Sequence, residues 1–209
     1  MSVAAIFDES GHPLQDTAGD GPAPKAIVVA YGFWIFLLSD IVMFSAIFAT
    51  YAVLAHATAG GPSGAQLFNR TRVLVETGCL LLSSYTCGLM SLGVEARHRV
   101  ATYCAALITF VLGAAFLSVE ISEFAGMVAR GATPERSAFL SAFFTLVGCH
   151  GLHVSFGLIW LVVMMAQVVT KGFREAVVRR LFCFSLFWHA LDIIWVGIFT
   201  VVYLIGTRS

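Results

Sequence analysis

Five long apolar stretches dominate this sequence and leave little freedom in how it can fold. They cover about residues 27–54, 73–94, 101–127, 139–169 and 181–206. Each has at least the ~20 residues that a helix needs to cross ~30 Å of hydrocarbon. Because a bilayer interior cannot hydrogen-bond an open backbone, the sequence predicts an all-α fold, an integral membrane bundle of five transmembrane helices.

The composition supports a membrane protein and excludes some partners. The chain is 59% hydrophobic and only 11% charged, and its twelve Lys and Arg balance twelve Asp and Glu. Without a basic excess, nucleic acid is not an expected partner. The cysteines are odd in number, lack C-x-x-C spacing and lie in or beside apolar stretches, so we interpret them as buried hydrophobes: Cys79, Cys87, Cys104, Cys149 and Cys183.

The polar segments define the ends and the loops. Residues 1–25 contain only scattered apolar residues, so we expect a disordered N-terminal tail and a five-helix domain over 26–209. No basic region precedes the short apolar run at the start, which argues against a cleaved signal peptide. Turn-forming residues at 59–64 and 131–137 predict helical hairpins. Seven loop Lys and Arg against five favour a cytoplasmic N-terminus and a periplasmic C-terminus.

Polar residues inside the predicted spans are the candidate functional groups. Five carboxyl groups and three histidines lie there: Asp40, Glu76, Glu120, Glu123, Asp192, His150, His153 and His189. Ionisable groups at this depth are costly when they face lipid, so they face protein, water or headgroups drawn inward, or they are protonated. Glu120/Glu123, His150/His153 and His189/Asp192 each have i,i+3 spacing and share a helix face. We expect the third and fourth spans to face each other through a Glu/His cluster.

Three interpretations of these residues remain open. The first is a structural clamp, which small-xxx-small spacings such as Ser84/Gly88 and Gly151/Ser155 favour. The second is a proton relay of carboxyl and imidazole groups. The third is a bound haem held by His153 and His189, which the acidic neighbours and evenly spread aromatic residues disfavour, or a copper or iron site made of His150, His153 and Glu120. A free-standing transporter is disfavoured because the spans lack broken-helix glycine and proline patterns.

Several motifs resemble subunit III of the haem-copper terminal oxidases. They are GCHGLHV at 148–154, SLFWHALDIIW at 185–195 and TVVY at 200–203, with Glu120-x-x-Glu123 and the segment 75–84 in support. Within that family, the segments 32–40, 48–54 and 58–62 look most like the branch of cytochrome bo-type ubiquinol oxidases. That branch has a five-helix subunit III, in agreement with the five spans.

The resemblance implies an accessory role in a bacterial inner membrane. In this family the haems and copper reside in subunit I, which reduces O2 to water while the complex oxidises ubiquinol. Subunit III is cofactor-free, packs with the other subunits (I, II and IV), holds phospholipid in a cleft and supports proton uptake. The resemblance therefore implies no catalytic or metal-binding residue here, and it makes the following residues structural, lipid-cleft or proton-handling candidates: Asp40, Glu76, Glu120, Glu123, His150, His153, Trp188, His189 and Asp192.

Two rival assignments and one departure from the family pattern accompany this interpretation. The rivals are a cytochrome c oxidase subunit III that lacks its first two helices, and a small membrane anchor with a bis-His haem b. In mitochondrial-type subunits a reactive glutamate precedes the second-span motif, whereas Glu76 lies inside it. We therefore do not assign that reactivity to Glu76.

Overall fold

The computed structural model describes residues 25–55, 57–58 and 70–205. The long helices in this part of the chain are α1 (Lys25–Leu54), α3 (Arg70–Glu95), α4 (Arg99–Ala129), α5 (Ala138–Lys171) and α6 (Glu175–Ile198). All five are long and apolar enough to span a membrane, which confirms the predicted fold class. Apart from Lys25, the expected N-terminal tail lies outside the described residues, and so does the loop at 59–64.

Short capped turns join the helices of the bundle. His98 caps the start of α4 and accepts a hydrogen bond from the Ala101 N–H on its Nδ1, at 3.3 Å. Gly131 adopts a φ of 76°, which glycine tolerates without strain, and leads into the 3-10 helix η1 (Pro134–Arg136). The Ser137 hydroxyl then caps α5 by accepting from the Leu140 N–H at 3.2 Å. The hairpin predicted at 131–137 is thus confirmed.

The last helix begins earlier than the sequence suggested. Its first residue is Glu175, before the predicted start at 181, and its first turns include Arg179 and Arg180. Long cationic side chains at a membrane edge can extend to the polar surface while their backbone stays helical. Beyond Ile198 the chain continues as a π-helical segment, η2 (Phe199–Ile205).

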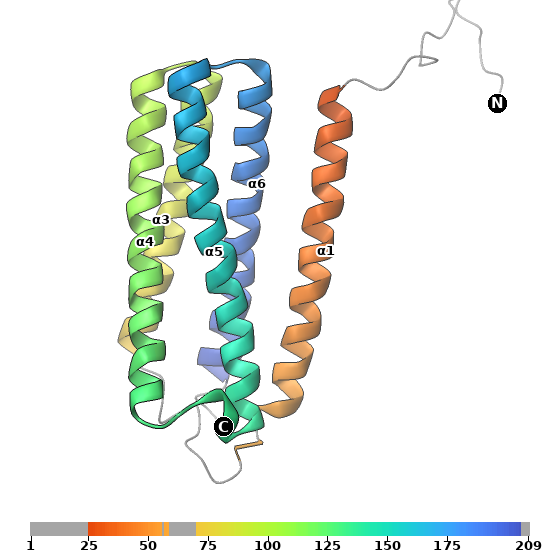
Figure 1. The fold of residues 1–209 in the computed structure, drawn as a ribbon, viewed down its shortest axis with the longest axis vertical. Coiled ribbons are helices and arrows are strands. Elements are labelled where there is room, and N and C mark those ends of the chain that lie inside the picture. The colour runs from red at the N-terminus through yellow and green to blue at the C-terminus, as the bar shows by residue number, and fades with distance from the viewer. Residues whose placement is uncertain (1–24, 56, 59–69, 206–209) are drawn as a thin grey trace, which may run out of the picture.

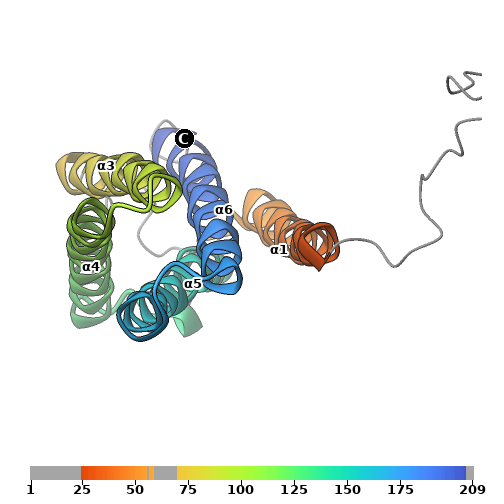
Figure 2. The same cartoon turned by 90° about the horizontal axis from the view of Figure 1, so that it is seen from above.

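Helices α3 to α6 form a bundle, and α1 stands beside it (Figures 1 and 2). From above, α3 neighbours α4 and α6, while α1 lies outside α6 and α5. In the most apolar part of the span 175–204, 61% is buried, whereas the corresponding value for α1 is 11%. Helix α6 is therefore the central element and α1 the peripheral one.

A row of side-chain hydrogen bonds joins α3 to α6, and we call it the α3/α6 seam. Trp195 Nε1 donates to Thr77 Oγ1 and Trp188 Nε1 donates to Ser83 Oγ, both at 3.1 Å. Nearer the other end of the pair, Ser91 Oγ donates to Ser185 Oγ, also at 3.1 Å. Such bonds satisfy polar groups that hydrocarbon cannot, and they hold membrane helices together.

The indole of Trp188 fills a space that two glycines leave open. A Cβ atom on Gly157 of α5 would lie 2.9 Å from Trp188 Cζ3, and one on Gly113 of α4 would lie 3.0 Å from Trp188 Cη2. Trp188 itself is only 1% exposed. The close packing of α4, α5 and α6 at this level thus requires glycine at both positions.

We predict that Gly157→Ala destabilises the protein by about 1–3 kcal/mol, because the new methyl group would overlap the fixed Trp188 ring. Gly126→Ala on α4 is the matched control, since nothing lies within 4 Å of a Cβ placed there. Thermal unfolding of the purified membrane protein in mild detergent measures both. Equal melting temperatures for the two variants would contradict the packing described.

Candidate functional site

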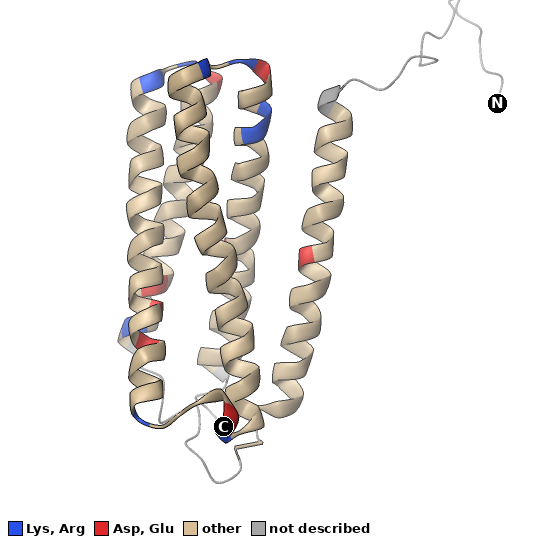
Figure 3. Cartoon of the chain, in the orientation of Figure 1, with Lys and Arg blue, Asp and Glu red and all other residues tan. Residues whose placement is uncertain are grey.

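Three glutamates from two helices form a buried group, which we call the carboxyl cluster. Glu76 of α3 is 1% exposed, and Glu120 and Glu123 of α4 are 4% and 5% exposed. They interact electrostatically with one another across the α3–α4 contact. The cluster lies toward the end of the bundle where α3 begins and α4 ends, as the red segments of α4 show (Figure 3).

Two tyrosines adjoin the carboxyl cluster. Tyr203, on the π-helical segment η2, interacts electrostatically with all three glutamates and with Tyr51 of α1. Within the described chain, the Tyr51 hydroxyl, both Glu76 oxygens and Glu120 Oε2 are buried without a hydrogen-bond partner. Buried polar atoms of this kind are costly unless water or a proton satisfies them. The arrangement is therefore suited to holding exchangeable protons or internal water.

The expected Glu/His cluster is only partly correct. Helices α4 and α5 do face each other here, since a Cβ on Gly151 would lie 2.9 Å from Glu120 Oε1. However, neither ring nitrogen of His150 has a hydrogen-bond partner among the residues that the structure describes. Instead, the ring of His150 is surrounded by aromatic rings with centroids 5.3–6.5 Å away, those of Trp195, Phe116 and Phe44. The predicted facing of the third and fourth spans is thus confirmed, whereas His150 makes no hydrogen bond to Glu120 among the described residues.

A second polar pair lies where α1 meets α5. His153 Nδ1 donates to the Cys149 carbonyl at 2.8 Å, and its ring lies 5.2 Å from that of Phe44 on α1. Asp40, one turn before Phe44, interacts electrostatically with His153. Both polar side chains are half-buried, so this pair faces the boundary between α1 and the bundle.

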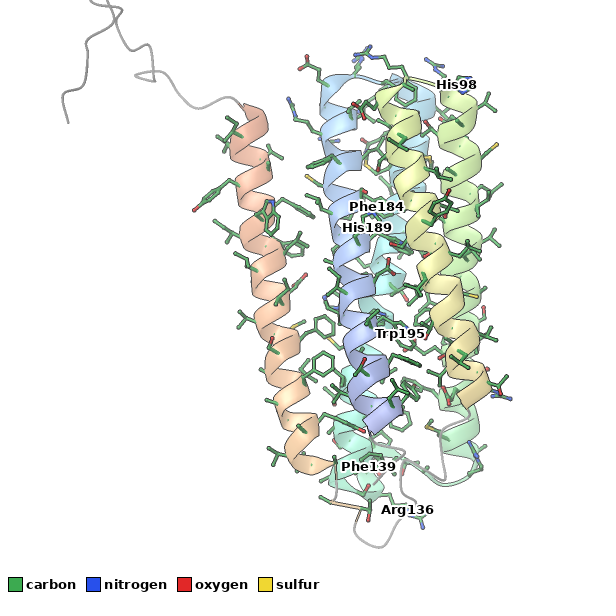
Figure 4. The ribbon with its side chains drawn as sticks, turned by 180° about the vertical axis from the view of Figure 1, so that it is seen from behind. His98, Arg136, Phe139, Phe184, His189 and Trp195 are labelled. Atoms are coloured by element: carbon green, nitrogen blue, oxygen red, sulfur yellow. The ribbon has the colours of Figure 1, made fainter. Side chains whose placement is uncertain are left out.

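His189 lies on α6 near the middle of the bundle (Figure 4), and Asp192 follows it on the same helix. Ser84 Oγ and His189 Nδ1 are 2.7 Å apart, which adds a further bond to the α3/α6 seam. Asp192 is 8% exposed and interacts with the same Ser84 hydroxyl. A serine, a histidine and an aspartate are thus close together, but the aspartate does not orient the imidazole as a hydrolytic triad requires.

The two histidines proposed for a haem have different neighbours. His153 contacts Phe44 of α1 and bonds its own helix, whereas His189 bonds Ser84 of α3. This geometry does not present the two imidazoles to the faces of one haem. Within residues 25–55, 57–58 and 70–205, no three His, Cys, Asp or Glu side chains converge as a metal site.

Sequence reasoning missed several members of these networks. Tyr51 and Tyr203 were not singled out, although both lie in segments quoted for the family resemblance. Thr77 and Ser83, which accept from the two tryptophans, were also missed. In the sequence, each of these two residues is a hydroxyl within an apolar span. The sequence alone does not show whether such a hydroxyl bonds a second helix or the backbone of its own helix.

Positive charge gathers at the end of the bundle opposite the carboxyl cluster (Figure 3). Two carboxylates, Glu95 and Glu175, lie among six basic residues there: Arg97, Arg99, Lys171, Arg174, Arg179 and Arg180. The one ion pair within 4.0 Å in the described chain joins Arg179 to Glu175. We call this the basic end.

Comparison with known proteins places these features in a family. The family model for cytochrome c oxidase subunit III matches residues 17–207. The chain is 54% identical to cytochrome bo(3) ubiquinol oxidase subunit 3 of Pseudomonas aeruginosa, over 84% of each protein. It is 48% identical to the protein of the same name from Pseudomonas putida, again over 84% of each. Identity to quinol oxidase subunit 3 of Bacillus subtilis is 42%, over 84% of this chain and 86% of that protein.

The contact between Ser84 and His189 gives a direct test of the α3/α6 seam. We predict that Ser84→Ala and His189→Phe show a coupling energy of about 0.6 kcal/mol in a double-mutant cycle, because each removes the same hydrogen bond. Unfolding of the purified protein by a denaturing detergent measures it. The control cycle pairs Ser118→Ala with His189→Phe, since the exposed Ser118 hydroxyl donates to the Ala114 carbonyl of its own helix. Strictly additive effects would contradict the contact.

Proposed function

The chain belongs to the cytochrome c oxidase subunit III family, and we propose that it is the third subunit of a cytochrome bo-type ubiquinol oxidase in a bacterial inner membrane. The observation that carries the proposal is the identity to quinol oxidase subunits over most of the chain. The catalytic chemistry, oxidation of ubiquinol and reduction of O2 to water, belongs to the haem- and copper-bearing subunit I. Subunits II and IV complete the assembly.

The role proposed for this chain is to support subunit I through helix packing. Several of its intramembrane polar groups serve interhelical contacts, as Trp188, Trp195 and His189 do in the α3/α6 seam. A subunit of this kind stabilises its neighbours by offering a preformed helical surface. Large apolar side chains remain exposed on α1, among them Tyr31, Trp34 and Val42, and this surface is available to lipid and partner helices.

The distribution of charge supports an orientation with the N-terminus in the cytoplasm and the C-terminus in the periplasm. The basic end is the end at which α1 begins, and loops rich in Lys and Arg remain on the cytoplasmic side. The carboxyl cluster then lies in the periplasmic half of the bundle. A reporter fused at the C-terminus that reacts only from the cytoplasm would contradict this orientation.

An apolar groove between α1 and α6 is the proposed phospholipid cleft. It has a volume of 430 Å³, and Ile27, Ala30, Phe182 and Arg179 are among its lining residues. A guanidinium beside an apolar groove suits a phosphate headgroup with its acyl chain. The splayed position of α1 at this end leaves the groove accessible from the bilayer (Figures 1 and 2). An Arg179→Gln oxidase with unchanged phospholipid content would contradict the assignment.

The carboxyl cluster supports a role in proton handling. Carboxyl groups at membrane depth are the usual components of proton relays. Glu76, Glu120 and Glu123 come from two helices, and the nearest basic side chains, Arg72 and Arg130, form no ion pair with them within 4.0 Å in the described residues. The cluster is therefore proposed to exchange protons that keep the neighbouring subunit active through repeated turnovers.

The test of the proposed function is purification of the tagged chain from its native membrane in mild detergent. We predict that subunit I and its haems copurify and that the product consumes O2 with ubiquinol as donor. An oxidase assembled without this chain should lose activity progressively during turnover. Activity with cytochrome c in place of quinol would favour the rival subunit III assignment, and a chain that purifies alone with its own haem would favour the anchor.

The proton-handling role has a separate test. We predict that Glu76→Gln and Glu120→Gln keep the initial rate of quinol oxidation but shorten the period of sustained turnover, because an amide cannot exchange a carboxyl proton. Glu135→Gln is the control, since Glu135 lies in η1 and outside the cluster. O2 uptake over many turnovers and proton release into the medium are the measurements. Variants identical to wild type in both would leave the cluster only a structural role.

A further inference from the structure

A second apolar groove lies between α4 and α5, away from the α1/α6 groove. It has a volume of 410 Å³, and its walls include Tyr103, Leu107 and Phe110 on α4 and Val162 and Met165 on α5. Seen from above, α4 lies on the side of the bundle away from α1 (Figure 2), and the two grooves share no lining residue. The two grooves are therefore separate surfaces.

The walls of this groove offer no free polar group to an occupant. Its polar side-chain atom is the Tyr103 hydroxyl, which already donates to the Met165 carbonyl at 3.4 Å. From Tyr103 to Phe110 the groove follows ~10 Å of helix, which is about two-thirds of the ~15 Å depth of one leaflet. An acyl chain matches both the apolar lining and this length.

A guanidinium lies at the mouth of the groove. Arg99 precedes Tyr103 by one helical turn, so both occupy the same face of α4. Its Nη2 atom would lie 3.3 Å from a Cβ on Gly172, the residue that caps α5. Arg99 therefore reaches across the ends of both walls, and it has no carboxylate within 4.0 Å among the described residues.

We propose that the α4/α5 groove binds one anionic phospholipid, with an acyl chain between Leu107 and Val162 and the phosphate at Arg99. The excess of cations over carboxylates at the basic end favours a negatively charged headgroup over a zwitterionic one. A transmembrane helix of a partner fits less well, because close helix approach needs small residues, and apart from Ala106 the side chains that line this groove are bulky.

Adjacent valines give a matched pair of variants for the test. Val162 lines the groove, while Val163 is similarly exposed on α5 but does not line it. Val162→Trp should fill the groove and Val163→Trp should leave it open. Arg99→Gln removes the charge at the mouth, and Arg130→Gln, at the other end of α4, removes a charge remote from it.

The experiment is native mass spectrometry of the intact assembly that contains the tagged chain, delipidated and then titrated with phosphatidylglycerol or phosphatidylcholine. We expect Val162→Trp and Arg99→Gln to bind one phosphatidylglycerol fewer than wild type, and Val163→Trp and Arg130→Gln to match wild type. Phosphatidylcholine should bind more weakly, and added salt should weaken phosphatidylglycerol binding to wild type more than to Arg99→Gln.

Three outcomes would overturn the proposal. They are equal phosphatidylglycerol binding by all variants, equal binding of the two lipids regardless of Arg99, and loss of a protein subunit from Val162→Trp, which would identify a partner helix as the occupant. The lipid count does not depend on quinol oxidase activity. Failure of this proposal is therefore distinguishable from failure of the proposed function, which would appear as an assembly without haem.

Discussion

The hydrogen bonds of the α3/α6 seam determine how the other helices are arranged. Inside a bilayer, van der Waals packing and side-chain hydrogen bonds must do what the hydrophobic effect does in water, because lipid tails are as apolar as leucine. The donors here are two indole groups, Trp188 and Trp195, and the acceptors are hydroxyls of α3. Indoles are large, so each bond also fixes a broad aromatic surface against which α4 and α5 pack.

The position of α6 follows from this seam, and the position of α1 follows from α6. Once the Trp188 ring is directed into the bundle, only glycine fits opposite it on α4 and α5, at Gly113 and Gly157. The contact of α1 with α5 is mainly aromatic and uses Phe33, Phe44 and Tyr51, beside the half-buried Asp40 and His153. A helix attached in this way leaves an apolar groove at one end, which is the structural basis of the proposed lipid cleft.

Much of this architecture could be predicted from the sequence, because hydropathy and turn residues are local signals. The five spans, the hairpin at 131–137 and the inward face shared by Glu120 and Glu123 were all available from spacing. The sequence did not predict which residues make up the carboxyl cluster. Glu76 and Tyr203 join Glu120 only through the tertiary contacts of α3, α4 and η2, and periodicity within one helix says nothing about which helices become neighbours.

The case of His150 shows why a polar residue at the right depth does not identify its partner. Glu120 and His150 were expected to meet because their helices are adjacent and their depths are similar. Helix α5 instead brings Gly151 against Glu120, one residue further along, which turns His150 toward Phe116 and Trp195. Successive residues on a helix point about 100° apart, so a single step in register exchanges a carboxyl neighbour for an aromatic one. The chemistry of the site thus depends on the rotation of α5, and the packing of Trp188 against Gly157 on the same helix constrains that rotation.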